Sequence, residues 1–397
     1  MDFFICCDRI SVMKKHYDVI IIGAGAAGLS AAGVAIVRGL AVAIFDMGDA
    51  PARKVMASGG GRCNITNTAA THDRYVGENP NFVRGALSRV APSDILNWAK
   101  KHKIKLYEKT PGRYFCQDGA GVVVNALMRD ANGADIFYNT KIDSIKKTSD
   151  GFIVNKITGK NLIIATGGIS FATLGVSDIG YKIAKQFGHR VIPPRPGLCA
   201  LAISGMPSDF AGISLPATIQ IGRAKITDDL LFTHFGIGGP AAYRASLYDI
   251  NNGININLVP VVDMPATLKS MKRTHGRKTV SGILSEHLPT RIAKWIAGND
   301  TRNIADIKDS DLSAIAERAT NMYFPGDKIK YHGMASAEVT CGGIDTADIS
   351  SKTMESKLCP GLFFAGEVMD ITGDLGGFNL QWAWASGRVA GNNVCNE

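Results

Sequence analysis

The segment Ser58 to Thr68, SGGGRCNITNT, combines three consecutive glycines with a cation, a thiol and two carboxamides. Glycine permits positive φ angles and lets another group approach the bare backbone closely. The N–H groups of Gly59, Gly60 and Gly61 can donate to an anion, and Arg62 can add charge-assisted hydrogen bonds. The segment by itself indicates either a loop that holds an anionic ligand or an ordinary flexible turn.

A second glycine group, GAGAAG, follows an apolar run that ends at Ile22. Gly23, Gly25 and Gly28 have the spacing G-x-G-x-x-G, which permits a tight turn, close approach of a pyrophosphate and close packing of a helix on a strand. Asp46 follows about 20 residues later, where an acid accepts hydrogen bonds from ribose hydroxyls. The acid argues against a 2′-phosphate, because two negative charges would repel. The pattern predicts a dinucleotide site. A plain βαβ unit is the alternative, and it leaves Asp46 unexplained.

The elements that must position these residues have the pattern of a parallel sheet with helices. Val19 to Ile22 and Ala41 to Phe45 are typical of strands buried on both faces, and the alanine-rich segment between them predicts a helix that ends near Arg38. Asn161 to Gly168 is a third buried strand with the ending Ala-Thr-Gly-Gly. This small ending suits a chain that passes close to an adenine nucleotide, and a simple turn is the alternative.

A further strand and helix near the C-terminus distinguish FAD from NAD. Leu362 to Ala365 predicts a strand, Gly366-Glu367 a turn that carries an acid, and Gly376-Gly377 the start of a helix that runs to about Val389. A helix N-terminus aimed at a flavin stabilises the negative charge of the reduced ring. A dehydrogenase that uses NAD alone has no need of this unit, and the sequence has no second G-x-G-x-x-G. The sequence therefore favours FAD.

Composition limits the class of protein. The chain has 397 residues, of which 46% are hydrophobic and 20% charged, so it is globular and long enough for two or three domains. Lys and Arg number 44 against 35 Asp and Glu, a net charge of +9, which favours anionic ligands. The basic residues are scattered, and the densest group, Leu268 to Lys278, indicates a solvated helix face.

Cysteine usage and the N-terminus indicate a cytoplasmic protein. The eight cysteines are scattered and form no C-x-x-C pair, which argues against a disulfide framework, a redox dithiol and a zinc site. We predict no metal site. The apolar runs are shorter than the ~20 residues of a membrane helix. Residues 1–16 do not read as a signal peptide and are expected to be disordered or extended, with Met13 as a candidate start.

Five segments together resemble one family. These are Arg53 to Asn67, Leu230 to Ser246, Ala337 to Ile349, Thr353 to Asp370 and Gly376 to Gly387. They are similar to the NAD(P)/FAD-dependent oxidoreductases that include dehydro-bile-acid reductase and aminoacetone oxidase, and the resemblance runs from about Tyr17 to the end. It implies an α/β fold with a Rossmann-like FAD-binding domain of the two-dinucleotide-fold type, formed by residues 17–191 and 335–397. An insert of residues 192–334, with a small β-barrel and a helical portion, interrupts this domain.

The sequence of the insert agrees with this organisation. It begins with a Pro-rich joint, Ile192 to Gly197, and continues with the β-like runs Thr218 to Ile226 and Gly253 to Val262. Apolar residues at spacings of three and four then predict helices over roughly Met264 to Asn321.

The resemblance also implies the site residues for non-covalent FAD. Thr233 and His234, near the GIGGP turn (Gly236 to Pro240), are the candidate catalytic residues. His234 can donate or accept a proton, and a structural histidine is the alternative. Cys63 is interpreted as a packed thiol, with a redox or covalent-flavin role as the alternative. The candidate cofactor-binding residues are Gly23, Gly25, Ala26, Ala27, Gly28, Asp46, Lys54, Ser58, Gly59, Gly60, Gly61, Arg62, Asn64, Thr166, Gly167, Gly168, Gly366, Glu367, Gly376, Gly377, Asn379, Leu380 and Gln381.

One departure from the family pattern affects the substrate. Relatives usually have Gly-Arg-x-Phe-Pro where this chain has GRYFCQDGAG, Gly112 to Gly121, with Cys116 and Gln117 in the Pro region. The substrate of a relative is therefore not carried over to this chain.

The expected activity is flavin hydride transfer on a small organic substrate by an FAD-dependent oxidoreductase. Reduction of a conjugated C=C bond, with NAD(P)H as a transient donor, is one possibility. Oxidation of a small amine or amino-ketone by dioxygen is another. An RNA-associated or redox-sensing flavoprotein is an alternative of a different class, which the charge of +9 permits. Nucleic acid is not the favoured partner, no membrane partner is expected, and no motif for hydrolysis or phosphoryl transfer is present.

Overall fold

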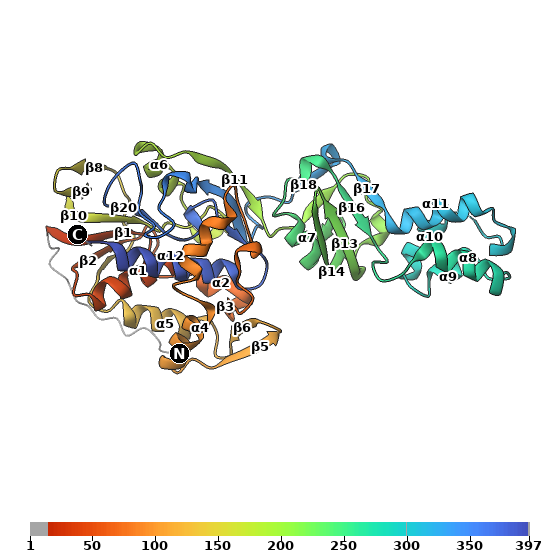
Figure 1. The fold of residues 1–397 in the computed structure, drawn as a ribbon, viewed down its shortest axis with the longest axis horizontal. Coiled ribbons are helices and arrows are strands. Elements are labelled where there is room, and N and C mark those ends of the chain that lie inside the picture. Colours follow the sequence, from red (N-terminus) through yellow and green to blue (C-terminus); the bar gives the residue numbers. More distant parts are fainter. Residues whose placement is uncertain (1–14, 299, 396–397) are drawn as a thin grey trace. The chain divides into compact units, whose positions relative to one another are not determined.

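The computed structural model describes residues 15–298 and 300–395. The chain divides into two compact units (Figure 1). Unit 1 comprises the described residues up to Pro194 and those from Thr340 onward, and unit 2 comprises Arg195–Val339. The expectation for residues 1–14, and with it Cys6 and Cys7, lies outside the described residues. His16, expected in a disordered or extended segment, begins a strand.

Unit 1 is built on a seven-stranded sheet whose central strands are parallel. The strand order is β7-β2-β1-β10-β9-β8, and β20 also pairs with β10. Because β1 and β10 are buried between neighbours toward their carboxyl ends, both end in fully buried apolar runs, Val19 to Ile22 and Leu162 to Ile164. The strands are β1 (His16–Ile22), β2 (Val42–Phe45), β7 (Asp135–Phe137), β8 (Ile145–Thr148), β9 (Gly151–Val154), β10 (Ile157–Ile164) and β20 (Leu362–Phe364). The expected α/β fold with a parallel sheet is confirmed.

Two glycine-rich helices of unit 1, α1 (Ala26–Val37) and α12 (Phe378–Asn393), lie side by side (Figure 1). A Cβ on Gly387 would lie 2.3 Å from the carbonyl oxygen of Ala27, and one on Gly391 would lie 2.4 Å from that of Ala31. Only glycine permits this approach, so the sequence of α12 is matched to α1.

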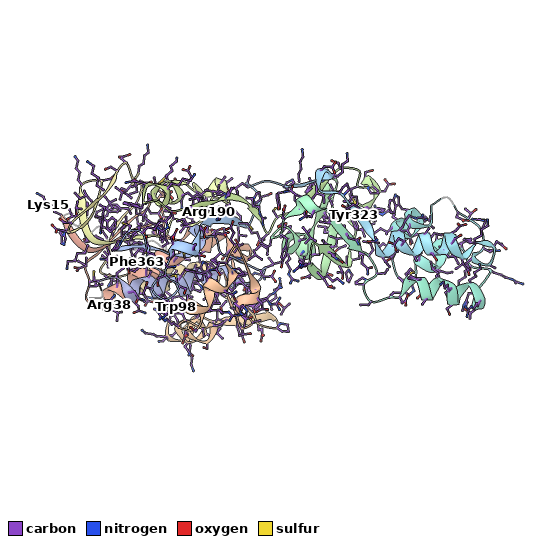
Figure 2. All side chains as sticks on the ribbon, turned by 45° about the horizontal axis from the view of Figure 1, so that its top comes forward. Lys15, Arg38, Trp98, Arg190, Tyr323 and Phe363 are labelled. Atoms are coloured by element: carbon purple, nitrogen blue, oxygen red, sulfur yellow. The ribbon has the colours of Figure 1, made fainter. Side chains whose placement is uncertain are left out.

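Smaller elements complete unit 1. The strands β5, β6 and β3 form an antiparallel sheet, β4 pairs with β21, and β11 pairs with β19. The strands of these three sheets are β3 (Asn64–Asn67), β4 (Tyr75–Val76), β5 (Leu106–Thr110), β6 (Arg113–Cys116), β11 (Val191–Gly197), β19 (Val339–Ile344) and β21 (Thr372–Gly373). Figure 2 shows Phe363 of β20 among packed side chains, and Arg190 at the surface, where it pairs with Glu78 at 2.9 Å. The helices are α2 (Arg53–Gly61), α3 (Arg84–Leu87), α4 (Pro92–Lys101), α5 (Ala120–Asp130) and α6 (Ile179–Gln186).

Unit 2 has its own hydrophobic core, formed between a sheet and a group of helices. Its seven strands pair antiparallel in the order β17-β16-β13-β14-β15-β12-β18. The strands are β12 (Leu201–Ile203), β13 (Ser214–Ile221), β14 (Ala224–Phe232), β15 (Gly236–Gly238), β16 (Ile254–Asn257), β17 (Met322–Phe324) and β18 (Ile329–Tyr331). The helices are α7 (Gly239–Ala245), which packs on β14, and α8 (Met264–Thr274), α9 (Val280–Leu284), α10 (Thr290–Ala297) and α11 (Asp309–Thr320).

One element differs from its expected form. The Pro-rich segment Ile192 to Gly197, expected as a joint, lies in β11. Proline lacks a backbone N–H but is compatible with the edge of a sheet, so β11 remains extended while its prolines limit further pairing.

Among the described residues, no helix combines the length and the apolarity needed to span a bilayer.

Candidate cofactor site

The carboxyl ends of four parallel strands meet at one edge of the sheet in unit 1. The backbone N–H of Gly23 donates to the carbonyl of Phe45 at 2.8 Å. In the same way Ala165 donates to Ile22 at 2.8 Å. The turns after β1, β2, β10 and β20 are therefore held beside one another. In open α/β sheets this edge is where ligands bind.

The three glycines after β1 have different physical requirements. Gly23 has a φ of 109°, and a Cβ there would lie 2.4 Å from the carbonyl oxygen of Ala165. A Cβ on Gly28 would lie 1.9 Å from the carbonyl oxygen of Gly23. Gly25 has an ordinary φ of −83°, and a Cβ there would meet no protein atom within 4 Å. Packing explains Gly23 and Gly28, whereas Gly25 leaves bare backbone beside open space.

That open space lies at the start of α1, where anions are favoured. The helix begins at Ala26, has no side-chain cap and has no acidic residue in its first turn. The N–H groups of the first turn, including those of Ala26 and Ala27, thus retain their donor capacity for an external acceptor. This arrangement fits the pyrophosphate of a dinucleotide such as FAD.

Asp46 lies beside this turn. Its Oδ2 accepts from the N–H of Ala24 at 2.6 Å, and its Oδ1 accepts from the N–H of Gly48 at 2.7 Å. Arg53 Nη2 lies 3.8 Å from Oδ1. Each carboxylate oxygen has more than one acceptor position, so these bonds orient the group and leave it able to accept from ribose hydroxyls.

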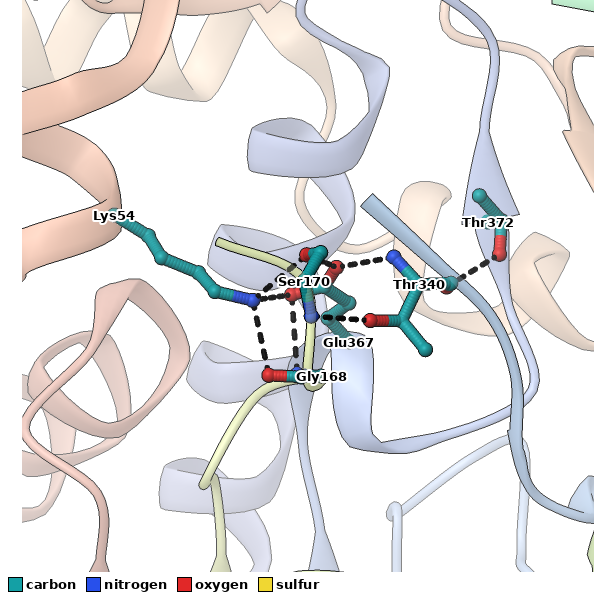
Figure 3. Close-up of polar contacts among 6 residues, drawn as sticks. All are labelled: Lys54, Gly168, Ser170, Thr340, Glu367 and Thr372. Atoms are coloured by element: carbon teal, nitrogen blue, oxygen red, sulfur yellow. Dashed lines mark hydrogen bonds and ion pairs between the residues drawn. The ribbon is translucent and has the colours of Figure 1, made fainter. Parts of the chain in front are cut away.

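Lys54 and Glu367 join the start of α2 to the turn after β20 (Figure 3). Lys54 Nζ lies 2.9 Å from Glu367 Oε2, and it also donates to the carbonyl of Gly168 at 3.0 Å and to Ser170 Oγ at 3.1 Å. Glu367 accepts from the N–H of Thr340 at 2.8 Å and from that of Gly168 at 3.1 Å. The three protons of the ammonium group match these three acceptors, so Lys54 is engaged by the protein.

These contacts decide the charge of Glu367. Burial raises the pKa of its carboxyl group, but the Lys54 ammonium and the N–H groups of Thr340 and Gly168 outweigh burial, and the pKa lies below its usual range. The group is therefore an anion at neutral pH. Ser170 and Thr340, which sequence reasoning missed, complete the cluster, since Ser170 N–H donates to Thr340 Oγ1 at 2.9 Å. No local pattern around either residue signals these contacts.

The glycines of the opening segment end α2. Gly59, Gly60 and Gly61 have φ angles of 58°, 65° and 82°, which residues with side chains rarely adopt. A Cβ on Gly60 or Gly61 would meet nothing within 4 Å. These glycines and Arg62 are exposed, while Ser58 Oγ donates to the carbonyl of Val55. The segment therefore presents bare backbone and a cation, as expected of a loop that meets an anionic ligand.

The two carboxamides of the same segment support the start of α12. Asn67 Nδ2 donates to the carbonyl of Gly376 at 2.8 Å. With its amide oriented to satisfy both ends, Asn64 accepts from the N–H of Gly377 at 3.1 Å. Gly376 and Gly377 have φ angles of 120° and 97°. The segment thus positions the glycine turn at the N-terminus of α12, and the amide of Asn64, a predicted cofactor contact, is engaged there by the protein.

The polar groups of Asn379 and Gln381, both predicted cofactor contacts, are engaged within the protein. Asn379 accepts from the N–H of Gly373 and donates to its carbonyl, each at 2.8 Å. Gln381 is fully buried, accepts from Thr66 Oγ1 at 2.6 Å and donates to the carbonyl of Val90 at 2.8 Å. Both amides stabilise the start of α12. Leu380, between them, is partly buried against the core of unit 1.

The turns after β10 and β20 contain closely packed small residues. A Cβ on Gly168 would lie 2.4 Å from Thr340 Oγ1, and one on Gly366 would lie 2.9 Å from the Cβ of Ala27. Gly167 has a φ of 71°. Thr166 Oγ1 is buried without a hydrogen-bond partner among the described residues, so the structure offers it no protein acceptor.

Cys63 is packed and chemically inert in this environment. Its side chain has no exposed surface, and burial raises the pKa of the thiol to about 12. Cys116 is also buried, and burial raises its pKa. Because the thiolate is the reactive form, the geometry favours the interpretation of Cys63 as a packed thiol.

The two candidate catalytic residues belong to unit 2, between β14 and β15. Thr233 N–H donates to the carbonyl of Gly236, and its Oγ1 is buried without a partner among the described residues. His234 is exposed, with its ring edge-on to that of Phe235 at 4.9 Å between centroids. Phe235 in turn stacks on His332 at 4.3 Å. Sequence reasoning missed Phe235 and His332, since no sequence signal links the two positions.

The chain is an FAD-dependent oxidoreductase. The fold and the site agree with this class, since the chain has the glycine turn, the acid after β2 and the second glycine-opened helix. Residues 17–393 match the family model described as the HI0933-like protein Rossmann domain, so the chain belongs to that family.

Three relatives are similar over almost their whole length. The ribosomal RNA dihydrouridine synthase of Escherichia coli is 36% identical over 387 residues, which cover 94% of this chain and 96% of that protein. The protein of the same name from Haemophilus influenzae is 37% identical over 403 residues, with 97% and 100% covered. The 3-dehydro-bile acid delta(4,6)-reductase of Clostridium scindens is 27% identical over 403 residues, with 94% and 97% covered.

Proposed function

We propose that this protein reduces uridine in ribosomal RNA to dihydrouridine. The observation that carries the proposal is the identity of 36% and 37%, over nearly the whole chain, with two proteins of that name. The sequence left open two possibilities, reduction of a conjugated C=C bond and association with RNA. This proposal combines them, because the reduced C=C bond belongs to a base of the RNA.

The proposed reaction suits the chemistry of the family. The C5=C6 bond of uracil is conjugated with the C4 carbonyl, so C6 accepts a hydride and C5 then takes a proton. The overall balance is uridine, NAD(P)H and a proton giving dihydrouridine and NAD(P)⁺. Bound FAD supplies the hydride transfer between the two substrates. The Clostridium scindens relative is also named as a reductase.

The residues of unit 1 hold and orient the cofactor in this proposal. The first turn of α1 and the bare backbone of Gly59 to Gly61 take the pyrophosphate, with the charge of Arg62 added. Asp46 accepts from the ribose. Glu367, kept ionised and fixed by Lys54, accepts from Thr340 and Ser170 through Oε1 and from Lys54 and Gly168 through Oε2, so it holds the turns after β10 and β20 in place beside the cofactor.

His234 is the proposed proton donor to C5 of uracil. It is exposed, and its ring is supported by Phe235. A histidine that donates this proton acts after flavin reduction, so it should affect only the half-reaction with RNA.

The test uses the purified protein with its bound cofactor. We expect FAD to be released on denaturation, and we expect NADH or NADPH to bleach the flavin under anaerobic conditions. Addition of ribosomal RNA that lacks dihydrouridine should then restore the colour, with two hydrogens gained by uridine as measured by nucleoside mass spectrometry. Bleaching of the flavin by an amine instead of NAD(P)H, followed by reoxidation by dioxygen and not by RNA, would indicate an oxidase and contradict the proposal.

A pair of variants tests the role of His234. His234→Asn should slow dihydrouridine formation by ~10²-fold or more, the range typical of a general acid, with unchanged bleaching by NAD(P)H. His287→Asn, a change at another exposed histidine of unit 2, is the matched control and should leave both steps unchanged. An equal effect of the two variants would exclude His234 as the donor.

A further inference from the structure

Basic residues gather on the first helix of the helical portion of unit 2 and on the turn that follows it. From Met264 to Ser285 the chain has no acidic residue. We call residues 269–278, at the end of α8 and beyond it, the basic turn. In Figure 1, α8 lies at the end of unit 2 away from the sheet β13–β14. The basic turn contains Lys269, Lys272, Arg273, His275, Arg277 and Lys278.

Two of these cations are neutralised within unit 2. Lys272 pairs with Asp309 at 2.7 Å, and Lys278 pairs with Glu286 at 2.8 Å. The remaining three, Lys269, Arg273 and Arg277, are exposed and have no ion pair or side-chain hydrogen bond to any residue that the structure describes. The basic turn thus has an uncompensated charge of about three.

The same turn forms one wall of a hollow of about 550 Å³. Residues 274–278 line one side, and Asn303, Ala305 and Asp306 line the other. Two backbone hydrogen bonds hold the walls together, from Ile304 N–H to the carbonyl of Lys278 at 2.8 Å and from Ala305 N–H to that of Gly276 at 3.2 Å. The shape is therefore built into the fold. Asp306 is the one acid in the lining, and because Lys278 is paired with Glu286, counting Asp306 leaves the basic turn and its hollow with a net charge of about two.

The charge of the basic turn is not explained by FAD or by the stability of unit 2. The predicted cofactor-binding residues all belong to unit 1. Uncompensated like charges on one helix and its adjoining turn lower stability slightly. A polyanion with regularly spaced charges accounts for three free cations beside a shaped hollow, because each cation can meet a separate phosphate.

We propose that the basic turn is a docking surface for the phosphate backbone of RNA, by which unit 2 binds the RNA that the enzyme modifies. The inference rests on the proposed function for the identity of that RNA as ribosomal. Arg273 and Lys269 on α8 meet phosphates along one strand, and Arg277 places its guanidinium at the hollow. These contacts do not depend on base sequence, so they supply affinity rather than choice of the uridine.

Two triple variants of the holoenzyme test the docking surface. The first combines Lys269→Ala, Arg273→Ala and Arg277→Ala. The matched control combines Arg223→Ala, Lys225→Ala and Lys330→Ala, three exposed cations on the β-sheet side of unit 2, and it removes the same charge. Melting curves of both triple variants separate a loss of docking from a loss of folding. The single variant Arg277→Glu changes one residue only and is a second test of docking if a triple variant fails to fold.

The measurement is the dissociation constant for a ribosomal RNA fragment across a range of salt concentrations. The basic-turn variant should bind ~10–100-fold more weakly near 0.1 M salt, and the slope of log K against log salt should fall by about 2–3, one for each phosphate contact. The control should stay within about threefold of the parent protein. An unchanged slope, or an equal loss in the control, would overturn the proposal.

Other ligands give different results. Polyglutamate that competes as well as RNA at equal ionic strength would identify an acidic protein as the partner and reject RNA. Inorganic phosphate that displaces RNA completely at equal ionic strength would identify a free-phosphate site, which also rejects it.

Activity measurements separate this inference from the proposed function. If the parent protein binds RNA through the basic turn but forms no dihydrouridine, the proposed function fails and the docking surface stands. If the basic-turn variant forms dihydrouridine in ribosomal RNA with unchanged kcat/KM, the docking surface fails and the proposed function stands. Bleaching of the flavin by NAD(P)H should be the same in all variants.

Discussion

At the scale of single residues, the charge of Glu367 depends on one side chain that is distant in the sequence. The side chains of Lys54 and Glu367 are 29% and 19% exposed, so both charges are largely removed from water. A largely buried ion pair contributes little when both partners are present, but removal of one partner leaves the other charge uncompensated. Lys54 therefore acts as a positioning residue for Glu367.

We expect Lys54→Met to lower the free energy of unfolding by roughly 1–3 kcal/mol at pH 7, less than for a fully buried pair because both groups keep some exposure. Denaturant titration measures this change. Lys182→Met is the matched control, since Lys182 pairs with Asp178 at the same 2.9 Å but with side chains 67% and 53% exposed. The control should cost less than about 0.5 kcal/mol, and an equal loss in both variants would contradict the role of burial.

The same variant has an expected pH dependence. The pKa of Glu367 is lower in the folded protein than its ordinary value of 4.5. Its contribution to stability is therefore present above about pH 4.5 and is lost as the pH falls through the folded pKa. Without Lys54 the folded pKa rises, so protonation costs the folded variant less than it costs the folded parent, and the stability deficit of Lys54→Met relative to the parent protein should shrink as the pH falls. Unfolding curves between pH 3 and 7, a range set around the ordinary pKa of Glu, measure the shift.

At the scale of elements, the turn from β1 to α1 separates packing from binding. Gly28 is required because the carbonyl of Gly23 occupies the place of its Cβ. Gly25 has an allowed φ angle, and a Cβ there would meet no protein atom within 4 Å, so neither packing nor backbone conformation requires a glycine at this position. Packing within the protein therefore requires glycine at position 28 of this motif but not at position 25.

Alanine at Gly28 should affect the stability of the protein, whereas alanine at Gly25 should affect its affinity for FAD. Gly28→Ala places a Cβ 1.9 Å from a backbone oxygen and should cost more than ~3 kcal/mol of stability or prevent soluble expression. Gly25→Ala should keep the melting temperature of the apoprotein but weaken FAD binding by ~10-fold or more, because the methyl group occupies the approach of the pyrophosphate. Flavin titration and thermal unfolding measure the two effects. Normal flavin affinity in Gly25→Ala would place the pyrophosphate elsewhere.

At the scale of the whole molecule, the two units have separate hydrophobic cores. The core of unit 1 is formed by residues on both sides of the insert, and that of unit 2 lies wholly between Leu201 and Ile329. Strand pairing in unit 2 is likewise internal, from β12 to β18. A core of this kind can fold by itself when its surrounding elements are complete.

We expect the fragment Arg195 to Val339 to fold cooperatively on its own and to be colourless. Circular dichroism and thermal unfolding measure the first property, and the visible absorption spectrum measures the second. The fragment has all seven strands of its sheet and its complete core, while the predicted cofactor-binding residues lie outside it. An unfolded fragment, or one that binds FAD, would show that the division between the units is not independent.

The sequence by itself determined the features that depend on neighbouring residues. The strands β1 and β2 and the helix α1 lie within a few residues of their expected bounds, because burial on both faces and the glycine spacing are local patterns. The same is true of the start of α12 after Gly377, and of the positive φ angles from Gly59 to Gly61. Five motifs also sufficed to indicate the class of enzyme.

Only the tertiary structure decided which distant groups meet. In the structure Lys54 pairs with Glu367, Asn67 donates a hydrogen bond to Gly376, and Phe235 stacks on His332. It also engaged the amides of Asn379 and Gln381 in the protein, where the sequence predicted contacts with the cofactor. Side-chain contacts between positions far apart in the chain depend on how strands are ordered and how helices pack on them. Local propensity contains no information on that order, and so a residue type can be recognised from the sequence while its partner cannot.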